Sequence, residues 1–110
     1  MENCIFCKVV KGEIPSEKIG ESENFIAIPD INPKVKNHTL IISKKHFVNI
    51  LDMPSVLGDE LISLVKKVAL NFKSDFNVVV NNGKNAGQVV FHFHLHLLPR
   101  KKGDGFRMAV

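Results

Sequence analysis

Apolar and polar residues alternate near the end of the chain, between Val89 and Arg100. Successive side chains of a β-strand point to opposite faces of its sheet, so this alternation predicts a strand. One face would carry three histidines and the other would bury four large apolar side chains: His92, His94 and His96, and Phe91, Phe93, Leu95 and Leu97. A helix would scatter both sets, because residues two apart on a helix do not face each other. Pro99 predicts the end of strand pairing, since it lacks an N–H donor.

A second apolar pattern, with steps of three and four residues, runs from about residue 54 to residue 72 and predicts an amphipathic helix. Its apolar stripe consists of Leu57, Leu61, Leu64, Val65, Val68 and Phe72. Asp52 and Ser55 are alternative N-caps for this helix. Shorter runs predict further strands at residues 18–21, 24–28, 38–43 and 76–80, the first two forming a hairpin. Five strands and one main helix indicate an α+β fold.

Composition fits one folded domain over residues 1–110, because 45% of the residues are hydrophobic and 24% are charged. No apolar stretch approaches the roughly 18 residues that cross a bilayer. The start, Met1-Glu2-Asn3, lacks the basic and apolar segments of a signal peptide, and two cysteines in such a chain predict a reducing cytoplasm. The net charge of +4 favours anionic ligands but is too small to imply nucleic acid by itself.

Three histidines on one strand face allow three interpretations. They could be the polar side of a half-buried strand, or ligands of a metal, although neighbours on one face converge poorly on a single ion. The third interpretation is phosphorus chemistry, in which a neutral imidazole attacks phosphorus and its neighbours bind the phosphoryl oxygens. Histidine can fill both roles near neutral pH because its unperturbed pKa is about 6.5.

Each of the other polar motifs also has more than one possible role when it is considered alone. Cys4 and Cys7 could be ordinary thiols, a redox pair or half of a tetrahedral zinc site. Asp30 lies between two prolines, where an aspartate often caps a turn. The Gly-rich segment 81–88 could be a plain loop or a cradle for an anion. The basic segment Arg100-Lys101-Lys102 could be a solvated face, or could attract polyphosphate or, weakly, RNA.

The alternating histidines of residues 92–98 resemble the signature of the histidine triad (HIT) family of nucleotide hydrolases and transferases. The resemblance covers nearly the whole chain, and its other motifs are Cys4–Lys8, Gly12–Pro15, Asp30–Pro33, His38–Ile42, Lys44–His46, Asn81–Gly83 and Ala86–Gln88. Length and N-terminal motif are most similar to the Hint branch and its bacterial relatives. The resemblance implies an α+β fold with a five-stranded antiparallel sheet, one main helix and a short N-terminal helix, assembled as a homodimer.

The resemblance also implies a role for each motif. His94 would be the nucleophile, His96 would bind phosphoryl oxygen, and His38 would support these imidazoles. A closed structural zinc site would consist of Cys4, Cys7, His46 and His92. Nucleotide contacts would come from Ile5, Phe6, Ile14 and Ile28 around the base, Asp30 at the ribose hydroxyls, and Asn81 and Gln88 near the phosphate or leaving group. Val89 stands where relatives usually carry Ser or Thr, which puts the preferred leaving group in doubt.

The expected function is hydrolysis of purine nucleoside phosphoramidates of the AMP-amine type through a nucleotidyl-histidine. Two alternatives remain at this point. Dinucleoside polyphosphate hydrolysis uses the same triad, and the basic segment 100–102 would suit its longer anion. The second alternative is a nucleotide-binding or partner-binding module with incidental turnover. Residues 106–110 also resemble, weakly, a C-terminal segment that helps select the substrate in related dimers.

Overall fold

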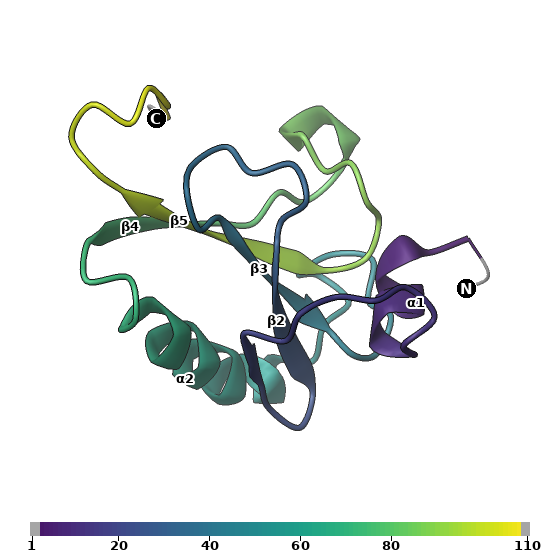
Figure 1. Cartoon of the computed structure of the whole chain (residues 1–110). Coiled ribbons are helices and arrows are strands. Elements are labelled where there is room, and N and C mark those ends of the chain that lie inside the picture. The colour runs from purple at the N-terminus through teal and green to yellow at the C-terminus, as the bar shows by residue number, and fades with distance from the viewer. Residues whose placement is uncertain (1–2, 109–110) are drawn as a thin grey trace.

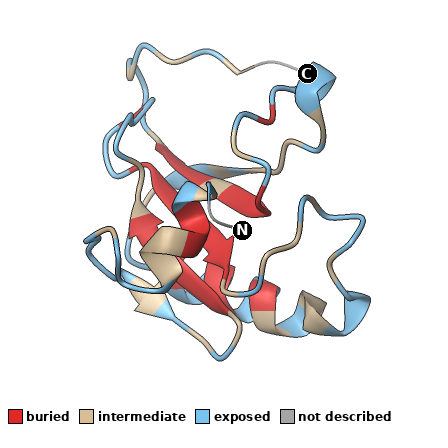
Figure 2. Cartoon of the chain, turned by 90° about the vertical axis from the view of Figure 1, so that its right-hand side faces the viewer, coloured by how far each residue is buried: buried red, intermediate tan, exposed pale blue. Residues whose placement is uncertain are grey.

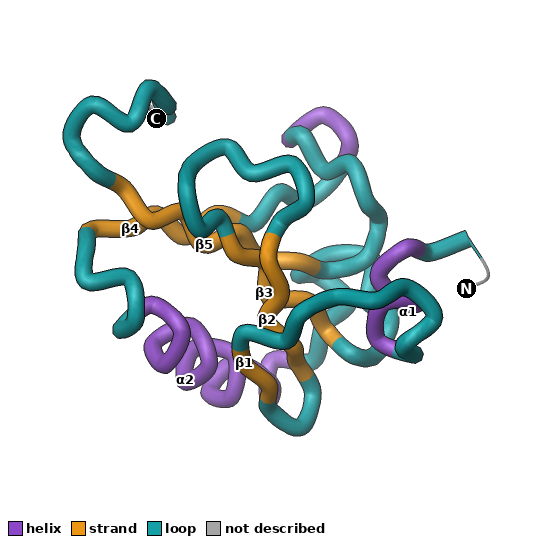
Figure 3. Tube along the Cα trace, in the orientation of Figure 1, coloured by secondary structure: helices purple, strands orange, loops and turns teal. Residues whose placement is uncertain are grey.

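The computed structural model describes residues 3–108, and its centre is one antiparallel five-stranded sheet with the strand order β1-β2-β3-β5-β4 (Figures 1 and 3). The strands are β1 Gly20–Glu21, β2 Phe25–Pro29, β3 Thr39–Ser43, β4 Asp75–Val79 and β5 His94–Arg100. The helices are α1 Ile5–Val10 and α2 Gly58–Ala69, with two 3-10 turns, η1 Ser55–Leu57 and η2 Lys84–Ala86. The α+β prediction and the hairpin of β1 and β2 are therefore confirmed.

The two faces of the sheet bury different apolar clusters. Figure 1 shows α2 along one face, where its buried stripe packs against residues of the strands. This cluster contains Phe25, Ala27, Ile41, Leu61, Leu64, Val65, Val68, Phe93, Leu95 and Leu97. On the opposite face, α1 packs Phe6 against Ile26, Ile28, Leu40 and Ile42. Figure 2 shows the buried strands between these two layers.

Strand register decides which histidines lie on the face of α1. Leu40 pairs with His96 and Ile42 pairs with His94, so both histidines share the face of the smaller apolar cluster. Phe93, Leu95 and Leu97 are buried on the face of α2, as the alternation predicted. His94 and His96 therefore lie on the side of the sheet that α1 covers.

The histidine strand is shorter at its start than predicted, because β5 begins only at His94. Residues 89–93 are irregular, and Phe91 is 47% exposed, so its predicted burial is wrong. The ring of His92 turns toward Cys4, and its Nε2–H donates to the carbonyl of Ser43 at 2.6 Å. His92 therefore precedes the strand, but its ring still lies on the α1 side of the sheet, because Phe6 packs edge-on against it as well as against His94.

Two boundary predictions are also wrong. Pro99 lies inside β5, opposite Phe76, because β3 already ends its pairing with β5 at Leu97 and the missing donor breaks no bond there. Neither Asp52 nor Ser55 caps α2, which begins after η1 without a side-chain cap. Asp52 instead accepts hydrogen bonds from the backbone of Val48 and Asn49. Within residues 3–108, no helix has the length and apolar character needed to cross a membrane.

Candidate functional site

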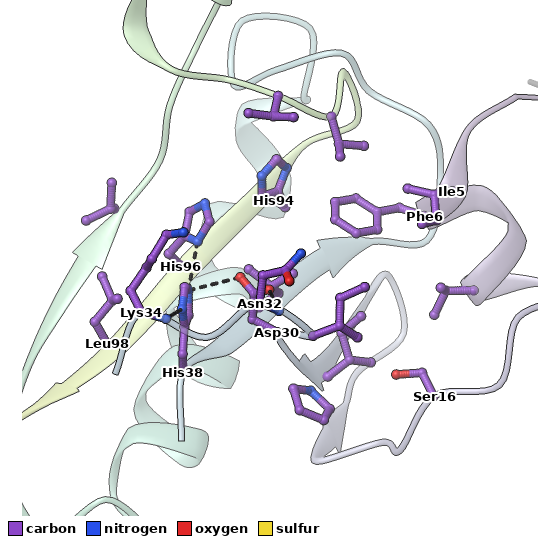
Figure 4. Close-up of a pocket in the computed structure, with 18 of the residues that line it drawn as sticks. Ile5, Phe6, Ser16, Asp30, Asn32, Lys34, His38, His94, His96 and Leu98 are labelled. Carbon is purple, nitrogen blue, oxygen red and sulfur yellow. Dashed lines mark hydrogen bonds and ion pairs between the residues drawn. The ribbon is translucent and has the colours of Figure 1, made fainter. Parts of the chain in front are cut away.

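A cavity of about 600 Å³ lies on the α1 face of the sheet, a volume typical of small-molecule sites. Its apolar wall includes four predicted base-pocket residues, Ile5, Phe6, Ile14 and Ile28. His38, His94, His96 and Asp30 line the same cavity. Figure 4 shows the imidazoles and Asp30 between the α1 side chains and Lys34. Residues predicted from distant parts of the sequence thus meet around one space.

Hydrogen bonding determines which nitrogen of His94 is free. Its Nδ1 lies 2.8 Å from the carbonyl oxygen of His92, which can only accept, so Nδ1 carries the proton. Nε2 of the neutral ring therefore keeps its lone pair. The Phe6 ring packs edge-on against the imidazole with centroids 5.0 Å apart, which restricts the orientation of the imidazole. A fixed ring with an available lone pair is suited to nucleophilic attack.

His96 has the opposite tautomer because of His38. The backbone N–H of Lys34 donates to Nδ1 of His38 at 3.0 Å, so the neutral His38 ring carries its proton on Nε2. That N–H donates to Nδ1 of His96 at 2.9 Å and also lies 3.3 Å from Oδ2 of Asp30. His96 is left with Nε2–H as a hydrogen-bond donor. One imidazole that can attack and one that can donate thus stand next to each other, with centroids 5.0 Å apart.

Burial keeps the supporting histidines neutral. It lowers the pKa of His38, an effect that the charge of Asp30 partly offsets. Burial, helped by the neighbouring His94 and His38, lowers the pKa of His96 to about 4. Both rings are therefore uncharged near neutral pH, and the tautomers fixed by the hydrogen bonds are the relevant forms.

Asp30 caps a turn, as the sequence allowed, and it also lines the cavity. One carboxylate oxygen, Oδ1, accepts the backbone N–H of Asn32 at 2.8 Å and so caps a turn. The other, Oδ2, faces His38, and the residue lines the cavity. Asp30, His38 and His96 have donor atoms close enough to hold a metal ion. Metal binding there would require a lone pair on Nε2 of His38, where the Lys34 N–H forces the proton to be, so this cluster is unsuited to a metal.

A second cluster of four side chains does fit a metal ion. Their ligand atoms all lie within 4.8 Å of one another, and the residues are Cys4, Cys7, His46 and His92. Nδ1 of His92 lies 3.2 Å from Sγ of Cys4 and 3.5 Å from Sγ of Cys7. Nδ1 of His46 lies 3.3 Å from Sγ of Cys7. Tetrahedral zinc with Zn–S of about 2.3 Å and Zn–N of about 2.0 Å would separate its S and N ligands by about 3.5 Å.

The protonation of these groups also suits a cation. The carbonyl of Ser43 takes the Nε2–H of His92, which leaves the Nδ1 lone pair facing the sulfurs. Burial raises the pKa of the Cys7 thiol, and the neighbouring Cys4 adds to this shift. A bound cation would offset this effect by stabilising the thiolate. Sγ of Cys4 additionally accepts the N–H of Cys7 and so caps α1.

The loop before β5 contributes three predicted residues in different ways. Asn81 and Val89 line the cavity, and Val89 is 83% exposed. Gln88 is buried and is not among the lining residues. Its amide donates to the carbonyls of Val48 and Val90, and its oxygen accepts from Gly83, so it holds the loop in place.

The end of the described chain forms part of the cavity wall, since Phe106 and Met108, from the segment that resembled a substrate-selecting one, line the cavity. Arg100 holds this segment by donating to Asp104, to the carbonyl of Phe106 and to Asn77. Its guanidinium is therefore occupied and does not belong to a free basic tail, as the run Arg100-Lys101-Lys102 had suggested. Of the resembling segment 106–110, residues 109 and 110 lie outside the described residues.

Two further residues had no signal in the sequence. Ser43 supports His92, and Lys34 fixes His38 through its backbone N–H. A serine in an apolar strand and a lysine in a turn are too common to be singled out. The side chain of Lys34 also lines the cavity.

Comparison with known proteins identifies the family of this chain. The family model of the HIT domain matches residues 11–103. The chain is 44% identical to Protein hit of Bacillus subtilis, over 96% of this chain and 77% of that protein. It is 37% identical to adenylylsulfatase HINT3 of Arabidopsis thaliana, over 93% of this chain and 54% of that protein. A solved zinc-bound histidine triad family protein from Mycobacterium smegmatis superposes with a TM-score of 0.85 and 38% identity, covering 94% of this chain and 79% of that one. The chain therefore belongs to the histidine triad (HIT) family.

Proposed function

We propose that the protein hydrolyses purine nucleoside phosphoramidates of the AMP-amine type through a nucleotidyl-histidine on His94. One observation carries the proposal: His94 donates Nδ1–H to the carbonyl of His92 and keeps an Nε2 lone pair in a cavity of nucleotide size. A similar solved structure is that of a HIT family hydrolase from Clostridium thermocellum, and the similar HINT3 of Arabidopsis thaliana is an adenylylsulfatase. Both support attack at a nucleotide α-phosphorus.

The cavity supports a binding mode for the nucleotide. The base would pack among Ile5, Phe6, Ile14 and Ile28, which form an apolar wall. Both ribose hydroxyls would donate to Asp30, whose carboxylate can accept several hydrogen bonds. In this binding mode the α-phosphate would lie at His94 and His96, with Asn81, which lines the same cavity, close to the phosphate or leaving group. Gln88 would act indirectly, through the loop that it holds.

The reaction would proceed in two displacements. Nε2 of His94 attacks the α-phosphorus, the P–N bond breaks with its electron pair on nitrogen, and the amine departs with a proton taken from solvent, to which the attacking water of the second displacement returns one. His96 donates its Nε2–H to a phosphoryl oxygen and stabilises the charge that develops there. Water then attacks the nucleotidyl-histidine, releasing AMP and restoring the imidazole of His94. His38 keeps His96 in its donor tautomer throughout.

Zinc is the proposed ion for the Cys4, Cys7, His46 and His92 cluster, because two sulfurs and two imidazole nitrogens are its preferred tetrahedral donors. With four protein ligands the ion has no open position for substrate. It would hold α1 against the sheet, and with it Ile5 and Phe6 of the cavity wall. Thiolate ligands require a reducing compartment, which supports a cytoplasmic location for this proposed single domain.

A homodimer is proposed from exposed apolar surface beside an open sheet edge. β4 is an edge strand, and its Phe76 and Val78 are 42% and 48% exposed. Ile62 and Leu70, in and just after α2, are 53% and 78% exposed. Pairing of two β4 edges would cover unpaired backbone and apolar side chains together. Light scattering during size-exclusion chromatography tests this, and a purely monomeric mass would reject it.

Turnover of two substrates tests the proposed reaction. The purified protein should hydrolyse an AMP-amine conjugate faster than a diadenosine polyphosphate, and acid-sensitive label should be trapped on the peptide that contains His94. Faster turnover of the polyphosphate would favour the polyphosphate hydrolase. Tight nucleotide binding with no turnover of either substrate would favour a binding module.

A further inference from the structure

Lys34 is the only residue with a permanent positive charge among the described residues that line the cavity. The ion pairs found within residues 3–108 leave its ammonium group without an acidic partner. The proposed reaction on His94 and His96 has given this side chain no task. A cation without an acidic partner, in an otherwise largely apolar cavity, favours the binding of an anionic group.

The backbone around Lys34 is fixed by the catalytic support itself. Its N–H donates to Nδ1 of His38, and the buried Val35 follows it in the chain. At the other side of the loop, the N–H of Asp30 donates to the carbonyl of His38 at 3.0 Å. The exposed Lys34 side chain therefore starts from a rigid position beside the His38–His96 pair.

The direction of the Lys34 side chain shows which end of the cavity its ammonium group faces. Figure 4 shows Lys34 extending toward His96, with Leu98 on the same side. Ile5 and Phe6 lie at the opposite side of the view, beyond Asp30. The charge of Lys34 contributes to lowering the pKa of both His38 and His96, so the ammonium is close to these rings. A nucleotide with its base at Phe6 and its phosphorus at His94 would direct its leaving group to Lys34.

The geometry points to a subsite at Lys34 that selects leaving groups carrying a negative charge. This inference rests on the proposed function and narrows it to conjugates in which the atom displaced from phosphorus bears an anionic group, such as a carboxylate or a sulfate. Arg100 cannot serve that charge, because its guanidinium is occupied by Asp104, Asn77 and the Phe106 carbonyl. The segment 100–102, which the sequence had suggested for a polyphosphate, does not line the cavity, so Lys34 is the cation available to a leaving group.

A matched pair of substrates isolates this charge. The AMP phosphoramidates of glycine and glycinamide contain the same P–N bond, but the first has a carboxylate where the second has a neutral amide. We expect wild type to show the higher kcat/KM for the glycine conjugate. Lys34→Met should lower the ratio of the two kcat/KM values by about five- to tenfold, since an ion pair at an open cavity is weaker than a buried one. Lys34→Arg should keep the ratio within about twofold, because the charge is retained.

Lys36→Met is the control, because Lys36 lies in the same loop but outside the cavity lining, and its loss removes the same net charge. It should leave the ratio unchanged. An equal ratio in wild type and Lys34→Met would overturn the inference. A similar fall in Lys36→Met would also overturn it, because the effect would then come from the overall field and not from a subsite. Equal losses on both conjugates in Lys34→Met would place the contact on the α-phosphate, which overturns it too.

Binding separates this inference from the proposed reaction. The affinities of both conjugates and of adenylyl sulfate are measured with His94→Ala, with and without Lys34→Met. Loss of affinity for the glycine conjugate and adenylyl sulfate, but not for the glycinamide conjugate, supports the subsite even if wild type hydrolyses none of them. Unchanged affinities would reject the subsite while leaving the reaction on His94 to its own test.

Discussion

The stability of the protein should depend on pH through His96. Burial lowers the pKa of this residue to about 4, whereas an unfolded chain has a histidine pKa of about 6.5. Between these values the unfolded state binds more protons than the folded state, so the free energy of unfolding falls as the pH falls. The contribution is fully present above pH 6.5 and is lost as the pH approaches 4. His38, whose pKa burial also lowers, acts in the same direction.

The expected loss for His96 follows from the two pKa values. Lowering the pH from 7 to 5 protonates this residue in most of the unfolded chains but in few of the folded ones. The free energy of unfolding should therefore fall by about 2 kcal/mol. Because the ring is only partly buried and solvent screens its charge, we expect about 1–2 kcal/mol. Urea denaturation at pH 7, 6 and 5, extrapolated to water, measures this change.

His96→Gln is the matched variant, because it keeps a polar side chain that does not titrate. Its unfolding free energy should fall less than that of wild type over the same pH range, by the share that His96 contributes. Protonation of the metal-site histidines affects both proteins equally and cancels in the comparison. Parallel curves for wild type and His96→Gln would refute the reasoning, since the protonation of His96 would then be the same in both states.

Other predictions follow from the same site. His94→Ala should lose nearly all turnover but keep its nucleotide affinity, and activity within a few-fold of wild type would exclude His94 as the nucleophile. Purified protein should contain about one zinc per chain, and chelation should lower the melting temperature more than the intrinsic activity. A zinc content far below one per chain, together with a melting temperature that chelation leaves unchanged, would count against the zinc site. Val89→Ser should raise kcat/KM on phosphoramidates about two- to tenfold, the worth of one hydrogen bond of about 0.5–1.5 kcal/mol. Because Val89 is 83% exposed, the smaller serine side chain loses little packing that could mask this gain. A Val89→Ser variant that is no faster with any amine leaving group would exclude a role for a hydroxyl group at this position.

Periodicity predicted the layers of the fold because burial follows it. The stripe of α2 and the buried Phe93, Leu95 and Leu97 were visible in the sequence for that reason. Alternation could not show where β5 begins, since tertiary contacts with Cys4 and Ser43 pull His92 out of the strand. The missing side-chain cap on α2 was equally invisible, because Asp52 bonds to the preceding loop instead.

Most residues of the candidate site could be listed from the sequence, but their protonation and tautomers could not. Three alternating histidines look alike in a sequence, and the difference between a lone pair on His94 and an N–H on His96 depends on partners at His92 and His38. The partner of His38 is the backbone of Lys34, and backbone donors leave no trace in side-chain patterns. The charge of Arg100 was misleading for a related reason, since its acidic partner Asp104 comes just after the basic run.

The walls of the cavity come from both extremes of the described chain. Ile5 and Phe6 of α1 form one part, and Phe106 and Met108 form another. During synthesis, residues up to Met108 must therefore have left the ribosome before this pocket can close. A foreign segment inserted beside Ile5 or Phe106 would lie next to the cavity, so it could alter KM without touching any catalytic side chain. Limited proteolysis that trims residues 106–108 should likewise report on ligand binding, because a bound nucleotide would shield them.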